Sequence, residues 1–279
     1  MALCSMVKGG LLMETLYSLP LPSKAIWEPE YEGVFLHINS RVCFAYKQGK
    51  TIHFSTIEDE RIVTKEIMTD GVDLPVKWLL VNNGSCLMCS ERYCFDLNAM
   101  QPCVNINEQY RQEYFAKSLS RGMHLVNDDY VFGDYTISHY KECGFLCKKS
   151  GKQIWKVNCR GYLYTDIRLY HDCILFGTDG MGGHFYVIEL STGEIKCDIN
   201  THGTKDFIVY NNMVYLLSRK ENKILAVSAD TWIINDEVAL AGKVSSSSRF
   251  IVDGDRIFAV TFEYMSRRPR RVLINVVRK

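Results

Sequence analysis

The sequence predicts an all-β protein that folds as a single β-propeller of six four-stranded blades. One pattern recurs along the chain: three mostly apolar residues, about three turn-forming residues, and then an apolar run. Its copies begin at positions 35, 79, 124, 168, 207 and 250, so they recur every 39–45 residues. Four strands in a repeat of about 40–45 residues are typical of a propeller blade. The two ends of the chain supply strands that together complete one blade.

Each copy of the pattern predicts a β-hairpin. Asn, Asp and Gly dominate its middle, as in "FIVYNNMVYLLS" from Phe207 and "FIVDGDRIFAVT" from Phe250. These residues tolerate positive φ and close tight turns, while the Val, Ile, Leu, Phe and Tyr on either side favour strands. Two further strands follow, most clearly in "HFYVIELSTGEIKCDI" at 184–199. Two stacked sandwiches also use short strands, but nothing in that architecture requires a constant period.

The predicted blades cover the whole chain, 1–279, as one domain. They span about 31–72, 73–106, 122–160, 163–202, 204–242 and 246–279. The last blade contains only three strands, and a strand at about 10–22 precedes the first blade without a blade of its own. We expect this N-terminal strand to complete the last blade, which removes an open edge and closes the ring. Seven blades are the alternative, with a degenerate blade within residues 100–123.

Composition and charge indicate a cytoplasmic protein. The chain has 279 residues, 47% of them apolar, and a net charge of +1, which gives no electrostatic basis for a nucleic-acid or membrane-surface partner. The sequence shows no sustained apolar region of the signal-peptide kind and no stretch near the ~20 apolar residues of a membrane span. The eleven cysteines are odd in number and are expected to be free, mostly buried thiols.

The segment "DCILFGTDGMGGHFYVIELSTGEI" at 172–195 resembles the repeat of the pyrroloquinoline-quinone-like propellers. The residues that match its Gly-Thr-x-Gly turn and its Thr-Gly-Glu turn are Gly177, Thr178, Gly180, Thr192, Gly193 and Glu194. The preceding copy also has the Trp of that repeat, Trp155. The resemblance implies the fold superfamily and no particular activity. Quinone-dependent members are much longer and often carry adjacent cysteines, which this chain lacks, so we expect no cofactor.

Two motifs suggest binding chemistry but fit structural roles better. The glycine-rich "GTDGMGG" at 177–183 could bind a phosphate, but a strand follows it, whereas a dinucleotide fingerprint needs a helix. Cys86 and Cys89 form a Cys-x-x-Cys pair, but no second pair follows at the spacing of a zinc ribbon. We therefore interpret the first motif as a hairpin turn and these cysteines as structural.

No catalytic constellation is apparent, so we expect a protein without enzyme activity. The seven histidines are scattered and show no metal-binding spacing. The alternative is a hydrolase or lyase that acts on a sugar or lactone with a metal at the propeller axis. The candidate ligands near the inner strands are Asp73, Asp166, His202 and Asp206.

One face of the predicted propeller is suited to a protein partner. The loops that enter each first strand and those that join second to third strands share this face, and they are rich in aromatic, acidic and arginine side chains of the kind used at interfaces. The candidate contact residues are Trp27, Glu28, Glu30, Tyr31, Tyr110, Tyr114, His139, Tyr140, Tyr162, Tyr164, Arg219 and Arg267. Of these, Tyr110 and Tyr114 fall in a short helix expected between Asn107 and Gly122.

We therefore predict a protein-binding propeller, most specifically a bacterial immunity or antitoxin-like protein that blocks a toxin domain. The acidic residues of one of two loops could then mimic a nucleic-acid backbone: Glu28, Glu30 and Glu32, or Glu58, Asp59 and Glu60. A nucleic-acid contact through Arg267–Arg271, expected in the hairpin between the second and third strands of the last blade, is the second alternative, which the near-neutral charge disfavours. Nothing in the sequence indicates membrane binding or a homo-oligomer.

Overall fold

The protein is all-β, as predicted. The computed structural model describes residues 12–21, 34–38, 41–48, 51–58, 60–68, 78–82, 85–89, 94–96, 101–102, 129–140, 144–180, 182–246, 248–265 and 268–279. Within these ranges the regular structure is β-strand, apart from one short 3-10 helix at Lys220–Asn222. Nothing in the described part of the chain could serve as a helical membrane span.

Three four-stranded antiparallel sheets come from the first part of the chain. The first sheet comprises β2 (Val34–Ile38), β3 (Arg41–Gln48), β4 (Thr51–Glu58) and β5 (Arg61–Met68). The second sheet comprises β6 (Trp78–Asn82), β7 (Ser85–Cys89), β8 (Cys94–Asp96) and β9 (Gln101–Pro102). The third sheet comprises β10 (Asp129–Phe132), β11 (Tyr135–Tyr140), β12 (Gly144–Lys149) and β13 (Lys152–Asn158).

Three further sheets follow, and the last of them takes its outermost strand from the start of the chain. The fourth sheet comprises β15 (Arg168–Tyr170), β16 (Cys173–Asp179), β17 (His184–Glu189) and β18 (Ile195–Asn200), with β14 (Tyr162–Leu163) beside the end of β16. The fifth sheet comprises β19 (Thr204–Tyr210), β20 (Met213–Ser218), β21 (Lys223–Ser228) and β22 (Ile234–Ala239). The sixth sheet comprises β23 (Phe250–Asp253), β24 (Arg256–Met265), β25 (Arg268–Arg278) and β1 (Glu14–Pro20).

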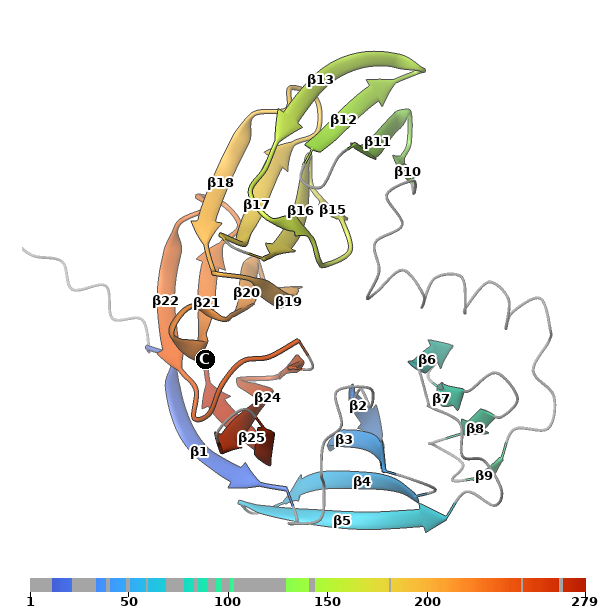
Figure 1. Ribbon diagram of the computed structural model, residues 1–279, viewed down its shortest axis with the longest axis vertical. Helices are drawn as coiled ribbons and strands as arrows, with labels where there is room; N and C mark the ends of the chain where they lie inside the picture. Colours follow the sequence, from blue (N-terminus) through green and yellow to red (C-terminus); the bar gives the residue numbers. More distant parts are fainter. Residues whose placement is uncertain are drawn as a thin grey trace, which may run out of the picture.

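The sheets follow one another in chain order along an arc around a common centre (Figure 1). In the fifth sheet, for example, β19 lies toward the centre and β22 at the outer edge. The recurring sequence pattern forms the hairpin between the first two strands in five of the six sheets, as predicted. In the third sheet the predicted turn is wrong: the apolar run at 130–132 belongs to the first strand, β10, and the turn follows it at Gly133 and Asp134. Antiparallel four-stranded sheets arranged in this way define a β-propeller-like fold.

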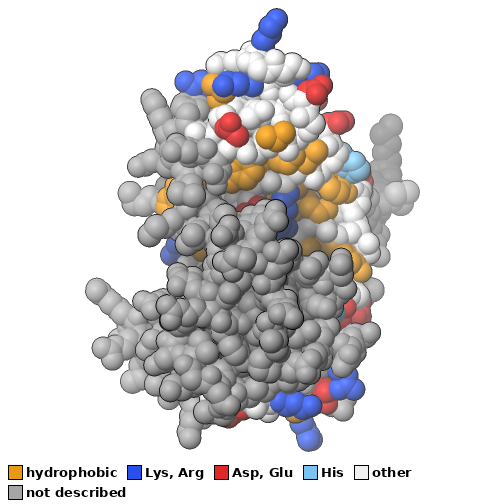
Figure 2. All heavy atoms as spheres, turned by 90° about the vertical axis from the view of Figure 1, so that its right-hand side faces the viewer, with side chains coloured by type: hydrophobic (Ala, Val, Ile, Leu, Met, Phe, Trp, Pro, Cys, Tyr) orange, Lys and Arg blue, Asp and Glu red, His pale blue; other side chains and the backbone are white. Residues whose placement is uncertain are grey.

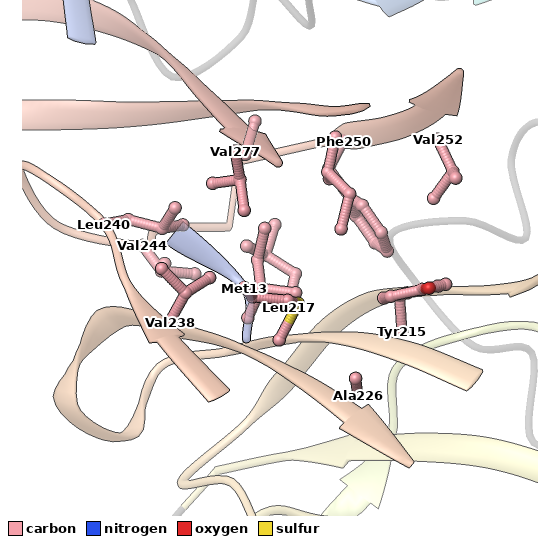
Figure 3. Close-up of a cluster of buried hydrophobic side chains, with 13 residues drawn as sticks. Met13, Tyr215, Leu217, Ala226, Val238, Leu240, Val244, Phe250, Val252 and Val277 are labelled. Carbon is pink, nitrogen blue, oxygen red and sulfur yellow. The ribbon is translucent and has the colours of Figure 1, made fainter. Parts of the chain in front are cut away.

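Among the residues whose burial is described, the hydrophobic clusters lie between neighbouring sheets. On β16, Ile174 and Phe176 are fully buried in a cluster with side chains of the third sheet, whereas Leu175 is buried in a cluster with the fifth sheet. Because successive side chains of a strand point to opposite faces, a central strand with a neighbour on each side is apolar along its whole length. Figure 3 shows the cluster between the fifth and sixth sheets, where Leu217 and Phe250 pack together with Met13.

Strand β1 covers the edge of β25. The two strands pair antiparallel, from Glu14 opposite Arg278 to Pro20 opposite Leu273. Met13 and Leu21, on either side of β1, are buried in two different inter-sheet clusters. This segment therefore contributes hydrogen bonds to the sixth sheet and side chains to the packing on both of its faces.

The outermost strands of three consecutive sheets each contain a bulge. Shifts in register leave one extra residue in β13, β18 and β22, namely Ile154, Lys196 and Asn235. A bulge twists an edge strand and disrupts its ladder, which hinders pairing with another chain. The edges of these sheets are therefore unsuited to adding a further strand.

The basic run Arg267–Arg271 lies at the hairpin between the second and third strands of the sixth sheet, as predicted, but it is not a loop. Strand β25 begins at Arg268, so the described residues of the run lie in the strand, and Arg271 is paired with Glu263 of β24 at 4.0 Å. A register shift beside Pro269 allows this, because proline is tolerated at a bulge. Arg267 and the helix expected between Asn107 and Gly122 lie outside the described residues, as does most of the segment considered for a seventh blade.

Candidate functional site

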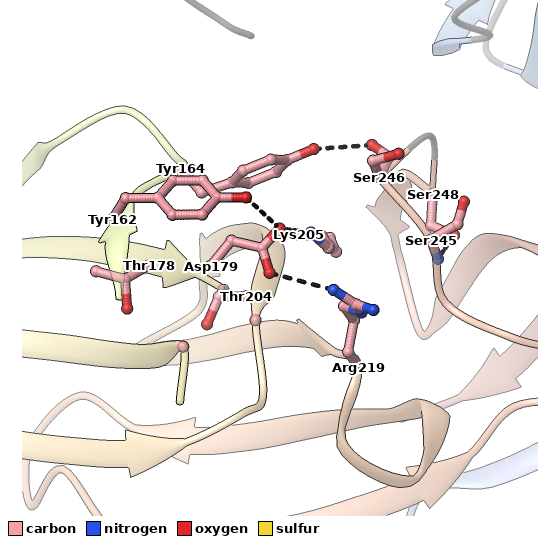
Figure 4. Close-up of polar contacts among 12 residues, drawn as sticks. Tyr162, Tyr164, Thr178, Asp179, Thr204, Lys205, Arg219, Ser245, Ser246 and Ser248 are labelled. Atoms are coloured by element: carbon pink, nitrogen blue, oxygen red, sulfur yellow. Dashed lines mark hydrogen bonds and ion pairs between the residues drawn. The ribbon is translucent and has the colours of Figure 1, made fainter. Parts of the chain in front are cut away.

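A buried carboxylate organises the loops at one end of the fourth and fifth sheets (Figure 4). Asp179 is the last residue of β16, and Lys205 lies at the start of β19. Arg219 directly follows β20, and Tyr162 lies in β14, which pairs with the end of β16. In an antiparallel sheet the start of the first strand lies beside the end of the second strand. These side chains therefore meet at one face, and it is the face that the sequence predicted for a protein partner.

Asp179 accepts hydrogen bonds from three side chains. Its Oδ2 atom contacts Lys205 Nζ in an ion pair and lies 3.3 Å from the Tyr162 hydroxyl. Its Oδ1 atom lies 3.3 Å from Arg219 Nη1. Asp179 and Lys205 are each only 4% exposed. Since a buried charge is tolerated only when it is paired and hydrogen-bonded, these contacts are what allow a carboxylate at this position.

The pKa directions reflect burial and pairing together. Burial alone would raise the pKa of Asp179, but the hydrogen bond and charge of Lys205, with Arg219 beyond it, hold that pKa below its ordinary value of 3.8. Burial lowers the pKa of Lys205, and the contact with Asp179 opposes this effect. Burial, followed by the charge of Asp179, raises the pKa of Tyr162. Asp179 is therefore an ionised carboxylate at neutral pH.

Tyr164 links this group of residues to the sixth sheet. Its hydroxyl donates a hydrogen bond of 3.0 Å to the backbone carbonyl of Ser246, just before β23. Its ring lies 4.1 Å from Lys205 Nζ, a distance typical of a cation–π contact. We call the set Tyr162, Tyr164, Asp179, Lys205, Arg219 and Ser246 the Asp179 cluster. Its members come from three consecutive sheets, so it fixes their loops relative to one another.

The Asp179 cluster combines a buried base with an exposed rim. Tyr162 is 46% exposed, and the Arg219 side chain is 48% exposed. Both are nevertheless held through Asp179, which is buried beneath them. Tyr and Arg are the residue types most often found at the energetic centre of protein interfaces.

A small polar pocket adjoins the Asp179 cluster at Tyr164 and Lys205. Its volume is about 120 Å³. The lining residues are Tyr164, Thr165, Asp166, Arg168, Lys205, Asp206 and Arg249, and we call it the inner pocket. Figure 2 shows acidic and basic side chains among hydrophobic ones in the described part of the face that looks to the right in Figure 1.

Two of the proposed metal ligands, Asp166 and Asp206, meet in the inner pocket. His202 is exposed in the turn before β19, and Asp73 lies outside the described residues. No group of three or more His, Cys, Asp and Glu side chains that could hold a metal occurs within the described ranges. The structure thus assembles two carboxylates with three cationic side chains in this pocket.

The structure brings together three of the predicted contact residues: Tyr162, Tyr164 and Arg219. His139 and Tyr140 lie at the end of β11 in the third sheet, where the His139 ring packs 5.2 Å from that of Phe145. The remaining predicted contact residues lie outside the described part of the chain; they are Trp27, Glu28, Glu30, Tyr31, Tyr110, Tyr114 and Arg267.

Sequence reasoning missed Asp179 and Lys205. Asp179 stands inside "GTDGMGG", whose first three residues end β16 and whose glycines then turn the chain into β17, with positive φ at Gly180 (94°) and Gly182 (85°). In such a turn an aspartate is indistinguishable from an ordinary turn residue. Lys205 next to Asp206 gives a stronger signal, because a lysine that enters an apolar inner strand needs a buried partner.

Replacing Gly203 with alanine is expected to destabilise the protein by about 1–3 kcal/mol. Gly203 has φ +122°, and a Cβ there would overlap the Asp179 carboxylate. Gly151 is a matched control, because its φ is +80° but nothing lies within 4 Å of a Cβ at that position. Urea denaturation of the two variants measures the difference, and equal losses would show that Gly203 is required only for its backbone conformation.

Comparison with known proteins finds weak structural similarity only. The sequence matches no protein-family model and no curated protein. The crystal structure of BamB from Moraxella catarrhalis aligns with a TM-score of 0.39 at 11% identity, covering 88% of this chain and 71% of BamB. The computationally designed Ika8 protein aligns with a TM-score of 0.39 at 9% identity, covering 87% of each chain. The class of this protein, all-β and propeller-like, is defined by its own sheets.

Proposed function

We propose that this protein is a non-enzymatic, protein-binding β-propeller that contacts its partner through the rim of the Asp179 cluster. In this proposal the six sheets are the blades of one closed ring, and β1 is the strand that closes it. The order of the sheets around a common centre and the pairing of β1 with β25 support the closed ring.

The observation that carries the proposal is the way in which Tyr162 and Arg219 are held. Each side chain is nearly half exposed, yet each donates a hydrogen bond to the same buried carboxylate. A side chain fixed before binding loses less conformational entropy when a partner docks, so more of its contact energy appears as affinity. The exposed part of the Arg219 guanidinium suits a carboxylate or backbone carbonyl of the partner.

The most specific form of the proposal is a cytoplasmic, bacterial immunity or antitoxin-like protein that blocks a toxin domain. An inhibitor of this kind needs a rigid surface that is already in its binding conformation. The buried Asp179–Lys205 ion pair beneath the exposed rim supports such rigidity.

The test is capture of a partner from the native host by the tagged protein and by single variants. We expect Tyr162→Ala and Arg219→Ala each to weaken binding of the captured protein about thirtyfold, the effect of losing about 2 kcal/mol at an interface centre. Arg256→Ala is the matched control, since its side chain is 51% exposed but lies at the β23–β24 hairpin, the opposite end of the strands.

Thermal melts of each variant exclude loss of the fold, which should persist because Lys205 still pairs with Asp179 when Arg219 is removed. If Tyr162→Ala and Arg219→Ala bind the partner as tightly as the parent protein and the Arg256→Ala control do, the proposed surface is contradicted. An equal loss in the Arg256 variant would place the interface elsewhere on the molecule.

A further inference from the structure

We propose that the loops around the Asp179 cluster bind an acidic segment of a partner protein, a stretch that presents several carboxylates. This inference rests on the proposed protein-binding function and names the chemistry of the partner. Its basis is four exposed basic side chains in the loops that lead into or join strands of the fourth to sixth sheets: Arg160, Arg219, Lys220 and Lys243. We call this set the basic ridge.

Backbone hydrogen bonds join these loops to one another. The Gly183 carbonyl, just before β17, accepts the N–H groups of Thr201 and Gly203, each at 3.2 Å. The Thr201 carbonyl accepts the Lys220 N–H at 2.8 Å. The Gly203 carbonyl accepts the Arg219 N–H at 3.2 Å. Three neighbouring loops therefore fix the backbone from which two of the basic side chains project.

The other two members of the basic ridge are attached to the same group of loops. The Arg160 carbonyl accepts the Thr178 hydroxyl of β16 at 2.6 Å. Lys243 lies in the loop before β23, where the side-chain oxygen of Asn222 accepts the Val244 N–H at 2.9 Å. The basic side chains therefore project from backbone positions that are fixed before a partner binds, which lowers the entropy cost of binding.

The positive charge of the basic ridge is largely unpaired. Within the described ranges, no Asp or Glu side chain forms an ion pair with Arg160, Lys220 or Lys243. Arg219 does contact Asp179, but its side chain is 48% exposed, and a guanidinium has five N–H donors. Each member can therefore bind a carboxylate of a partner.

Acidic side chains of the same face are balanced by basic ones. Glu221 pairs with Lys223 at 2.6 Å, and Glu263 pairs with Arg271 at 4.0 Å. The inner pocket contains two aspartates, two arginines and Lys205, which is paired within the Asp179 cluster, so the pocket adds no net charge. The described part of this face is therefore positive because of the basic ridge.

The turns at the opposite end of the fourth, fifth and sixth sheets are acidic. None of these turns, all of them described, contains a lysine or an arginine, and they contribute four acidic residues: Asp172, Glu194, Asp230 and Asp255. Loops that are basic at one end and acidic at the other orient a protein toward an acidic surface during approach, which raises the association rate.

The small extent of the basic ridge favours a protein over a nucleic acid. A nucleic acid carries a phosphate at every nucleotide and would also meet Glu221, which follows Lys220 in the chain. The net charge of +1 gives no long-range attraction to such a polyanion. A protein segment can instead place its carboxylates opposite the basic side chains alone.

Three fluorescent probes test the inference on the full chain: a decaglutamate peptide, an uncharged decaglutamine peptide and a single-stranded thymidine oligonucleotide of the same length. We expect fluorescence anisotropy in low salt to show decaglutamate binding about tenfold more tightly than decaglutamine, because it forms several exposed ion pairs. Decaglutamate binding no tighter than that of decaglutamine would overturn the inference, and so would tighter binding of the oligonucleotide.

Two double variants locate the site. Lys220→Gln with Lys243→Gln is expected to weaken decaglutamate binding about fivefold. Lys148→Gln with Lys152→Gln removes the same charge from exposed positions at the opposite end of the third sheet and is expected to weaken it less than about twofold. Circular dichroism of each variant reports the fold. Equal weakening by the two double variants would overturn the basic ridge as the site.

The peptide probe separates this inference from the proposed function. If Tyr162→Ala weakens capture of the native partner but decaglutamate does not bind, the protein-binding surface stands and the acidic partner is overturned. If decaglutamate binds at the basic ridge but neither Tyr162→Ala nor Arg219→Ala affects the native partner, the proposed function fails and the acid-binding ridge stands.

Discussion

Replacing Asp179 with alanine is expected to lower the free energy of unfolding by about 3–5 kcal/mol. The variant leaves the Lys205 ammonium, 4% exposed, without its ionic partner, and removes the acceptor that orients Tyr162 and Arg219. An unpaired buried charge carries its full desolvation cost, which is far larger than the loss of a surface ion pair. Urea denaturation of the two proteins, with equal m values, measures the difference directly.

A second substitution separates pairing from packing. When Lys205→Met accompanies Asp179→Ala, no buried charge remains, and most of the lost stability is expected to return. Glu237→Ala serves as the control for an exposed ion pair, because Glu237 binds Lys223 at 2.6 Å but its side chain is 51% exposed. We expect this variant to lower the free energy of unfolding by less than about 1 kcal/mol. A double variant no more stable than Asp179→Ala alone would contradict the assigned cost of the unpaired lysine.

The Asp179–Lys205 ion pair also predicts how the difference in free energy of unfolding between the parent protein and the Asp179→Ala variant depends on pH. The pKa of Asp179 is lower in the folded protein than its ordinary value of 3.8, so the unfolded chain binds more protons between the two values. The stabilisation by the Asp179 carboxylate is therefore present in full above its pKa in the unfolded chain, and it is lost as the pH falls through its pKa in the folded protein. The difference in free energy of unfolding between the parent and the Asp179→Ala variant should therefore shrink below about pH 4.

The first hairpins of five sheets could be predicted because their determinants are local. Asn211 and Asn212 adopt positive φ between two apolar runs, and Gly254 does so in the sixth sheet. Turn chemistry and strand propensity act over a few residues, so they are readable without knowledge of the tertiary structure. The order of the sheets then follows from their order in the chain.

The Asp179 cluster could be predicted only in part, because its contacts join distant positions. Tyr162, Tyr164 and Arg219 stand in or beside the connections between the repeated strands, so their shared face was readable from the repeat. Asp179 and Lys205 meet because β19 lies beside β16 in the neighbouring sheet, and the pairing of β14 with β16 brings Tyr162 over them. No local pattern encodes an approach between sheets, and the extra strand β14 has no counterpart in the described residues of the other sheets.

Strand β25 illustrates a second limit of local reasoning. A run of arginines around Pro269 has the composition of an exposed loop, yet it continues the ladder with β24 through a shift in register. Charged residues and proline are acceptable at such a place because the partner strand offers Glu263 and the bulge removes the need for one backbone N–H. The composition of the run therefore predicts the exposure of Arg271 correctly, but it predicts a loop where the structure has a strand.

Removing the N-terminal strand is expected to have the largest effect of all. A chain that begins at residue 22 loses β1 and with it the buried side chains of Met13 and Leu21, each of which contributes about 2–5 kcal/mol by the cost of truncating a core residue. It also loses Ser18, whose hydroxyl lies 2.7 Å from Oδ1 of the fully buried Asn275. A total above about 4 kcal/mol corresponds to a fall in Tm of at least about 7 °C, measured by calorimetry.

Adding the missing strand back as a peptide distinguishes closure of the sheet from a general effect of shortening. The peptide LMETLYSLPL, residues 12–21, is expected to raise the Tm of the shortened chain with increasing concentration, because a ligand that binds only the folded state stabilises it by mass action. A scrambled peptide of the same composition cannot place Met13 and Leu21 in their two clusters and should have no effect. A shortened chain that melts at the temperature of the full chain would show that the sixth sheet is stable with β25 at its edge, and that β1 does not close the ring.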